Sequence, residues 1–150
     1  MNPASLELVR SWLTQRNLYH LYDADSQSVL ITRENVETAH VRVVDRPERG
    51  MMTWAIVLPF TVPDDRHLPV AEALNLLNSA SFMGSWVMNT QRSEVYFRAT
   101  VGTIGVQWDE AAIEYLLRVV VTTADQLGEM VRRVAKEGAA ATTVLPARNE

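Results

Sequence analysis

The three histidines are the side chains best suited to chemistry, because imidazole serves both as a metal ligand and as a general base. His20, His40 and His67 are far apart in the 150-residue chain and fall in different predicted elements. None has another histidine, aspartate or glutamate at metal-ligand spacing on the same face. His67 follows two aspartates, but a turn that caps a helix explains this cluster more simply. We therefore expect neither a metal site nor a cofactor.

The serine, glycine and carboxylate motifs do not indicate catalysis either. In GSW (84–86) the serine precedes a strand, whereas a nucleophile elbow places it between glycines on a strand-to-helix turn. GTIG (102–105) lacks the lysine that follows a phosphate-binding loop. A glycosidase needs two carboxylates that converge on its substrate, and the candidates Glu72 and Glu94 fall on faces expected to be solvated. Because the chain has no cysteine, thiolate catalysis and disulfides are excluded. We expect a protein that is not an enzyme.

One set of polar residues could bind an anionic ligand. Tyr96 and Arg98 lie on the same face of a predicted strand, and with His40 they would be the polar groups of a pocket between the sheet and a long helix. Arginine and tyrosine suit carboxylate or phosphate ligands. This alternative, a small-molecule-binding protein or an enzyme, requires the three side chains to converge. An Arg98 in solvent, or in a simple salt bridge with Glu94, would remove it.

Two asparagines mark the end of a predicted helix over residues 69–80. On a helical wheel, Asn78 lies at the border of the buried arc and Asn75 lies closer to the polar side. An asparagine at this border can bond backbone groups of the following loop, so Asn78 is interpreted first as a helix-to-strand junction. The alternative is a polar edge on a binding or dimer surface.

Apolar residues around this junction exceed what one core of sheet and helices needs. Methionine and aromatic side chains are common on adaptable binding surfaces, although core packing is the alternative for each residue taken singly. We predict a partner or dimer interface formed by Leu76, Asn75, Asn78, Phe82, Met83 and Trp86. The sequence does not separate a dimer interface from a partner site, because both are exposed apolar patches.

Hydrophobic periodicity predicts the elements that hold these residues. In the first half of the chain, a helix over residues 4–18 with Ser5 as its N-cap is followed by strands over 28–34, 39–45 and 52–60. The first two strands read as a hairpin around Asn35.

The second half repeats this scheme with fewer strands. The helix over residues 69–80, capped by Asp64 or Asp65, leads into a hairpin of strands over 84–89 and 93–101. A long helix capped by Asp109 follows, and its apolar positions alternate at spacings of four and three: Ile113, Leu117, Val120, Ala124, Leu127, Val131 and Val134. The β-branched run 119–123 leaves open whether this helix is broken.

The resulting order is helix, three strands, helix, two strands, long helix, which indicates an α+β domain with helices on an antiparallel sheet. We expect one domain over residues 1–137. Gly138 stops the last helix and no periodicity follows it, so residues 138–150 are predicted to be a flexible C-terminal tail.

The overall charge argues against two classes of partner. The net charge is −4 and the basic residues are scattered, whereas nucleic-acid binding needs clustered lysine and arginine. No run approaches the ~18 apolar residues of a membrane span, and the N-terminus does not resemble a signal peptide. We expect a cytoplasmic protein that binds neither nucleic acid nor membrane.

The junction also carries a family resemblance. The segment AEALNLLNSASFMGSWVMNTQRSEVYFRATV, with the capped helix after it, resembles the YbjN family of small bacterial proteins. In that family a helix with an asparagine-containing turn leads into a hairpin whose second strand carries an aromatic–arginine pair, here Tyr96 and Arg98. The resemblance covers about residues 67–137, and the first 66 residues agree only in element order.

This resemblance implies the fold of type III secretion chaperones, with the order α-β-β-β-α-β-β-α that the periodicity also gives. The family is described as regulators of sensory transduction or chaperone-like proteins, without an established reaction. Secretion chaperones of this fold commonly dimerise through the middle helix and hold extended segments of their partners. The resemblance therefore implies a non-enzymatic, homodimeric protein-binding module whose partner is unknown.

Overall fold

The computed structural model describes residues 2–33 and 40–146. It confirms the α+β class, with three α-helices and an antiparallel sheet in the described part of the chain. The helices are α1 (Leu6–Gln15), α2 (His67–Ala80) and α3 (Glu110–Lys136), and the short 3-10 helices are η1 (Pro47–Arg49), η2 (Asp64–Arg66) and η3 (Ala141–Val144). The strands are β1 (Asn2–Pro3), β2 (His20–Asp23), β3 (Ser28–Ile31), β4 (Val41–Arg46), β5 (Met51–Thr61), β6 (Ser85–Asn89), β7 (Glu94–Gly102) and β8 (Gln107–Trp108).

Six of the strands form one sheet in the order β2-β3-β4-β5-β7-β6, and every neighbouring pair is antiparallel. The predicted pairings of β3 with β4 and of β6 with β7 are confirmed. The turn predicted at Asn35 lies outside the described residues. Strand β2 was not predicted, and it joins β3, β4 and β5 as a fourth strand of this sheet from the part of the chain before α2. Strands β1 and β8 pair separately.

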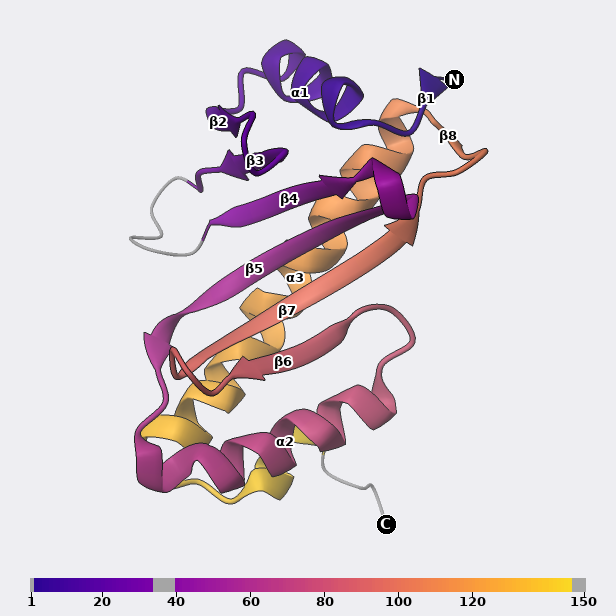
Figure 1. Cartoon of the computed structure of the whole chain (residues 1–150). Helices are drawn as coiled ribbons and strands as arrows, with labels where there is room; N and C mark the ends of the chain where they lie inside the picture. The colour runs from indigo at the N-terminus through magenta and orange to yellow at the C-terminus, as the bar shows by residue number, and fades with distance from the viewer. Residues whose placement is uncertain (1, 34–39, 147–150) are drawn as a thin grey trace.

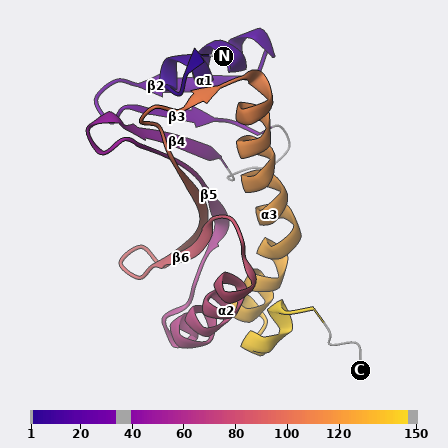
Figure 2. The ribbon, with the colours of Figure 1, turned by 90° about the vertical axis from the view of Figure 1, so that its right-hand side faces the viewer.

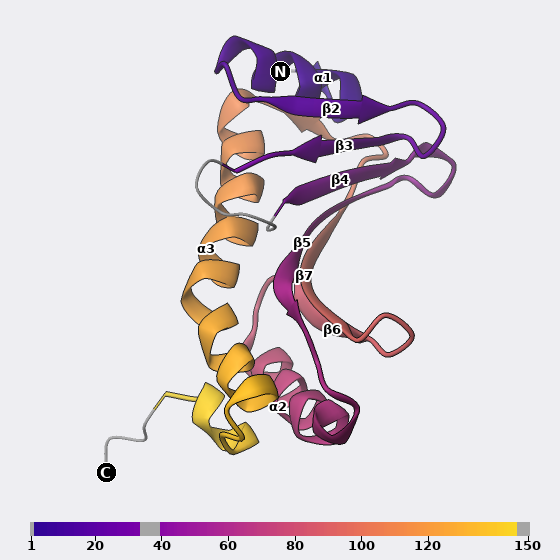
Figure 3. The same ribbon diagram turned by 90° about the vertical axis from the view of Figure 1, so that its left-hand side faces the viewer.

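The helices cover one side of this sheet and its two ends. Helix α3 runs behind the sheet along its length, while α1 and α2 lie at opposite ends (Figure 1). Side views show that the sheet is strongly bent, with its hollow side facing away from α3 (Figures 2 and 3). We call this uncovered side the concave face. The buried side chains of β5 and β7 point toward α3: Met52, Trp54, Ile56, Leu58, Val95, Phe97 and Ala99.

Helix α3 forms as its pattern predicts. The Asp109 carboxylate accepts the backbone N–H of Ala112 at 2.9 Å, which satisfies one of the free donors at the helix start. Five of the seven predicted stripe residues are buried, and Leu117 and Leu127 are half-buried. The helix is continuous through residues 119–123, so the β-branched run does not break it.

Of the caps predicted for the two shorter helices, the one on α1 is confirmed and the one on α2 is wrong. Ser5 caps α1 as predicted, since its Oγ accepts the backbone N–H of Leu8 at 3.2 Å. The cap predicted from Asp64 or Asp65 is wrong, because both residues belong to η2 and α2 has no side-chain cap. A capping residue needs an extended backbone, and here the chain passes from η2 into α2 through His67, which is already helical.

The C-terminal segment differs from the expected free tail. Gly138, at φ +69°, follows the end of α3 as predicted. Residues 139–146 then pack back onto the body, and Ala141 and Val144 lie in the core at 7% and 2% exposure. The Arg66 guanidinium holds this return by donating to the carbonyls of Val134 at 2.7 Å and Ala139 at 3.0 Å. Residues 139–146 contact α2 and α3, which lie elsewhere in the sequence, so local periodicity could not reveal this packing.

Candidate functional site

The junction between α2 and β6 is held by one side chain. Asn78 Nδ2 donates to the carbonyl of Trp86 at 3.0 Å, and the Trp86 N–H donates to Asn78 Oδ1 at 2.7 Å. Gly84 completes the turn at φ +78°, where a Cβ would lie 2.5 Å from Phe97 Cζ. This geometry matches the interpretation of Asn78 as a junction residue.

Trp86 does not belong to a surface. It is 3% exposed, and its ring lies 5.3 Å from the ring of Phe97. Its place in the predicted interface is therefore corrected: strand alternation turns Trp86 toward α3 and into the core.

The outward side of α2 is the most apolar exposed helix surface described. Leu68 is 80% exposed and Phe82, in the loop after α2, is fully exposed at 107%. Leu76 and Met83 are half-buried, and Tyr115 Oη donates to Met83 Sδ at 3.6 Å. We define the α2 outer surface as the exposed residues Leu68, Ala71, Glu72, Asn75, Ser79, Ala80, Ser81 and Phe82.

Only one residue of the α2 outer surface, Glu72, is charged. A helix that faces water normally carries charged and polar residues on its outer side, and a helix apolar all round is normally covered. The α2 outer surface thus has the composition of a contact surface. Of the predicted interface, the structure places Asn75 on it and Phe82 at its end.

His40, Tyr96 and Arg98 lie together on the concave face. Tyr96 pairs with Val57, and the register of β4 and β5 places His40 on the other side of Val57. Arg98 is one pleat further along and exposed. Their predicted role in a pocket between the sheet and α3 is wrong, because alternate residues of a strand point to opposite faces and Phe97 occupies the side toward α3.

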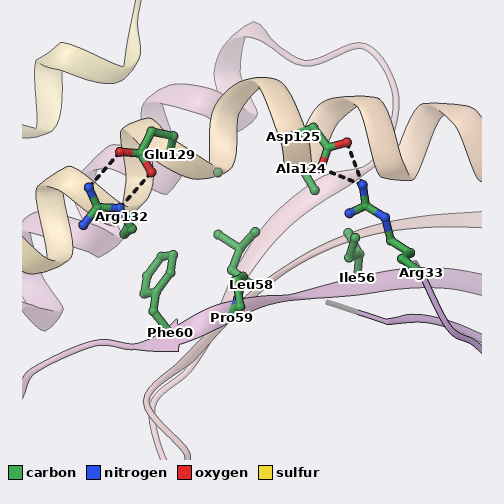
Figure 4. Close-up of a pocket in the computed structure, with 10 residues that line it drawn as sticks. Arg33, Ile56, Leu58, Pro59, Phe60, Ala124, Asp125, Glu129 and Arg132 are labelled. Carbon is green, nitrogen blue, oxygen red and sulfur yellow. Dashed lines mark hydrogen bonds and ion pairs between the residues drawn. The ribbon is translucent and has the colours of Figure 1, made fainter. Parts of the chain in front are cut away.

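A pocket does lie between the sheet and α3, with different polar residues (Figure 4). Its volume is about 210 Å³, and its apolar lining comes from β5 and α3: Ile56, Leu58, Pro59, Phe60, Ala124 and Gly128. Two ion pairs stand at its rim, Arg33 with Asp125 at 2.7 Å and Arg132 with Glu129 at 2.7 Å. Arg33 and Asp125 are 92 residues apart, so local sequence patterns could not predict this pairing.

The rim carboxylates are occupied by their arginines. The hydrogen bond from Arg132 lowers the pKa of Glu129 to about 2, so this carboxylate stays ionised near neutral pH and does not serve as a general acid. The residues lining the pocket include no serine, histidine or cysteine. As far as the described residues show, the pocket is a small apolar cavity between two ion pairs.

Two further observations concern metals and membranes. Within residues 2–33 and 40–146, no three histidine, aspartate or glutamate side chains gather closely enough to hold a metal ion. Among the described helices, none is both long and apolar enough to cross a bilayer.

Two solved structures share this fold. The crystal structure of YbjN, "a putative transcription regulator from E. coli", matches with a TM-score of 0.59 and 15% identity over 82% of this chain and 93% of that chain. The crystal structure of the ExsC–ExsE complex matches with a TM-score of 0.65 and 14% identity over 85% of this chain and 97% of that chain. The likeness confirms the expected fold, that of type III secretion chaperones.

The sequence itself identifies the family. Residues 5–133 match the model of the YbjN family, described as "Putative bacterial sensory transduction regulator". Because this match spans most of the chain, the chain belongs to the YbjN family. The resemblance drawn from residues 67–137 is confirmed and extends to α1. A search of curated proteins finds no match to this sequence.

Proposed function

We propose that this chain is a non-enzymatic protein-binding module, regulatory or chaperone-like, that acts as a homodimer. The description of its family as a regulator of sensory transduction supports the regulatory part. The ExsC–ExsE complex, in which one partner shares this fold, supports protein binding. We also propose a cytoplasmic location, since the chain has no cysteine that an oxidising compartment would act on.

The α2 outer surface carries this proposal. Its single charge and the fully exposed Phe82 resemble the core of a protein interface, where charged residues are depleted and aromatic anchors enriched. Small residues such as Ala71 and Ser79 allow close approach of another element.

A second copy of the chain is the occupant that we assign to this surface. Most homodimers are two-fold symmetric, so the same patch must contact itself. The α2 outer surface is suited to this because Glu72 is its only charge, so few like charges would meet across the two-fold axis. Other partners would then bind elsewhere on the dimer.

Affinity capture from a lysate of the source cells, read by mass spectrometry, tests protein binding. The tagged natural chain is compared with Leu68→Asp/Phe82→Asp and with Ile104→Asp, a control at an equally exposed apolar site on the loop between β7 and β8. We expect the natural chain and the control to capture the same partner, and the double variant to lose self-association. Recovery of no specific protein by any form would contradict the proposal.

A further inference from the structure

The concave face of the sheet carries a group of arginines on a chain that is acidic overall. Arg42 and Arg98 flank Ala55 on neighbouring strands, since Ala55 pairs with both. Strands lie about 4.8 Å apart, so the two arginines start about 10 Å from one another. Arg92, from the turn between β6 and β7, lines the same hollow as Arg42 and His40. The face thus gathers three arginines, Arg42, Arg92 and Arg98, against two carboxylates, on a chain whose net charge is −4.

Apolar side chains lie between these charges. Leu30 and Val57 line the hollow, whose volume is about 540 Å³, and Tyr96 lies beside Val57. Two carboxylates, Asp23 and Glu94, also belong to its lining. The face therefore offers spaced positive charges, an apolar strip and two carboxylates, of which Asp23 already accepts hydrogen bonds from Asp25 and Ser26.

We infer that the concave face binds an acidic, extended segment of a partner protein. The arginines are spread over several strands, which suits a chain with carboxylates at intervals better than one compact anion. Asp23 and Glu94 interrupt the positive charge, so the face suits carboxylates at intervals rather than the continuous charge of nucleic acid. The Glu94 carboxylate can also accept hydrogen bonds from peptide N–H groups. The inference rests on the proposed protein-binding function and adds the chemistry of the partner.

Fluorescence anisotropy with defined peptides tests this inference. The probe is a fluorescein-labelled peptide of four Glu-Val-Asp-Thr repeats, and the matched control peptide carries lysine at each acidic position. The test variant is Arg42→Gln/Arg98→Gln. The control variant, Arg118→Gln/Arg133→Gln, removes the same charge from exposed positions on α3.

We expect the acidic peptide to bind the natural chain and the lysine peptide not to bind. The test variant should weaken binding by about tenfold, the size expected for two partly exposed ion pairs, and the control variant by less than about twofold. Arg42→Lys/Arg98→Lys should keep part of the affinity, because the charges remain.

Three results would overturn the inference. They are absence of binding to the natural chain, equal binding to the test and control variants, and displacement of the peptide by pyrophosphate or single-stranded DNA at lower concentration than by unlabelled peptide. Sedimentation of the same samples distinguishes failure of the peptide-binding inference from failure of the proposed homodimer. A dimer that does not bind the acidic peptide overturns only the inference. A monomer that binds the peptide overturns only the proposed homodimer.

Discussion

Asn78 shows how one side chain can join two elements of this fold. Its side-chain amide makes hydrogen bonds with both the N–H and the carbonyl of Trp86, and these two bonds join the end of α2 to the start of β6. Its position at the border of the buried arc made a junction role predictable. The burial of Trp86 was not predictable, because the chain segment 81–85 decides which face of β6 turns inward, and that segment has no periodicity.

Replacing Asn78 by alanine should lower the free energy of unfolding by about 2 kcal/mol, because two partly buried backbone groups lose their partners. Gln126→Ala is the control, an exposed amide side chain on α3 outside both proposed surfaces, and should change stability by less than about 0.5 kcal/mol. Urea unfolding followed by circular dichroism measures both. Equal effects of the two substitutions would show that Asn78 is not a junction residue.

At the scale of elements, pattern and caps predicted most of the fold. The stripe of α3 correctly predicted the buried face of that helix, since its pattern records the contact of one element with one core. Strand β2 escaped prediction because three of its four residues are exposed and it is defined by pairing with β3. The return of residues 139–146 escaped it because Arg66, far away in sequence, holds that segment.

The last turns of α3 also carry a pH-dependent contribution. Arg132 lowers the pKa of Glu129 from 4.5 to about 2. A carboxylate with a lowered pKa stabilises the folded state above its unfolded pKa, and this stabilisation is lost as the pH falls through the folded value. At neutral pH the natural chain should therefore melt above Glu129→Gln. The difference should be about 2 °C or less, because Glu129 is half exposed.

Thermal melts from about pH 7 down to about pH 2 would check this. The difference between the natural chain and Glu129→Gln should shrink below about pH 4.5 and vanish near pH 2. Glu48→Gln removes the same charge from an exposed position in η1, away from the α2 outer surface, and controls for net charge. A difference that grows as the pH falls would contradict the assignment.

At the scale of the whole molecule, two surfaces with different chemistry are assigned to different occupants. The α2 outer surface is almost uncharged and carries the exposed Leu68 and Phe82. The concave face carries both arginines and carboxylates and lies on the side of the sheet away from α3 (Figure 2). Of the candidate sites, sequence correctly grouped His40, Tyr96 and Arg98 but assigned them to the wrong face. Phe97 packs on the side of β7 toward α3, so its neighbours Tyr96 and Arg98 point to the opposite face.

Sedimentation equilibrium of the purified protein tests the central claim, that the α2 outer surface is a protein interface, most directly. The natural chain and Ile104→Asp should sediment as dimers. Leu68→Asp/Phe82→Asp should sediment as a folded monomer with the circular-dichroism spectrum of the natural chain, because both side chains are exposed in the monomer. A natural chain that remains monomeric at high concentration, or a double variant that remains dimeric, would contradict the account.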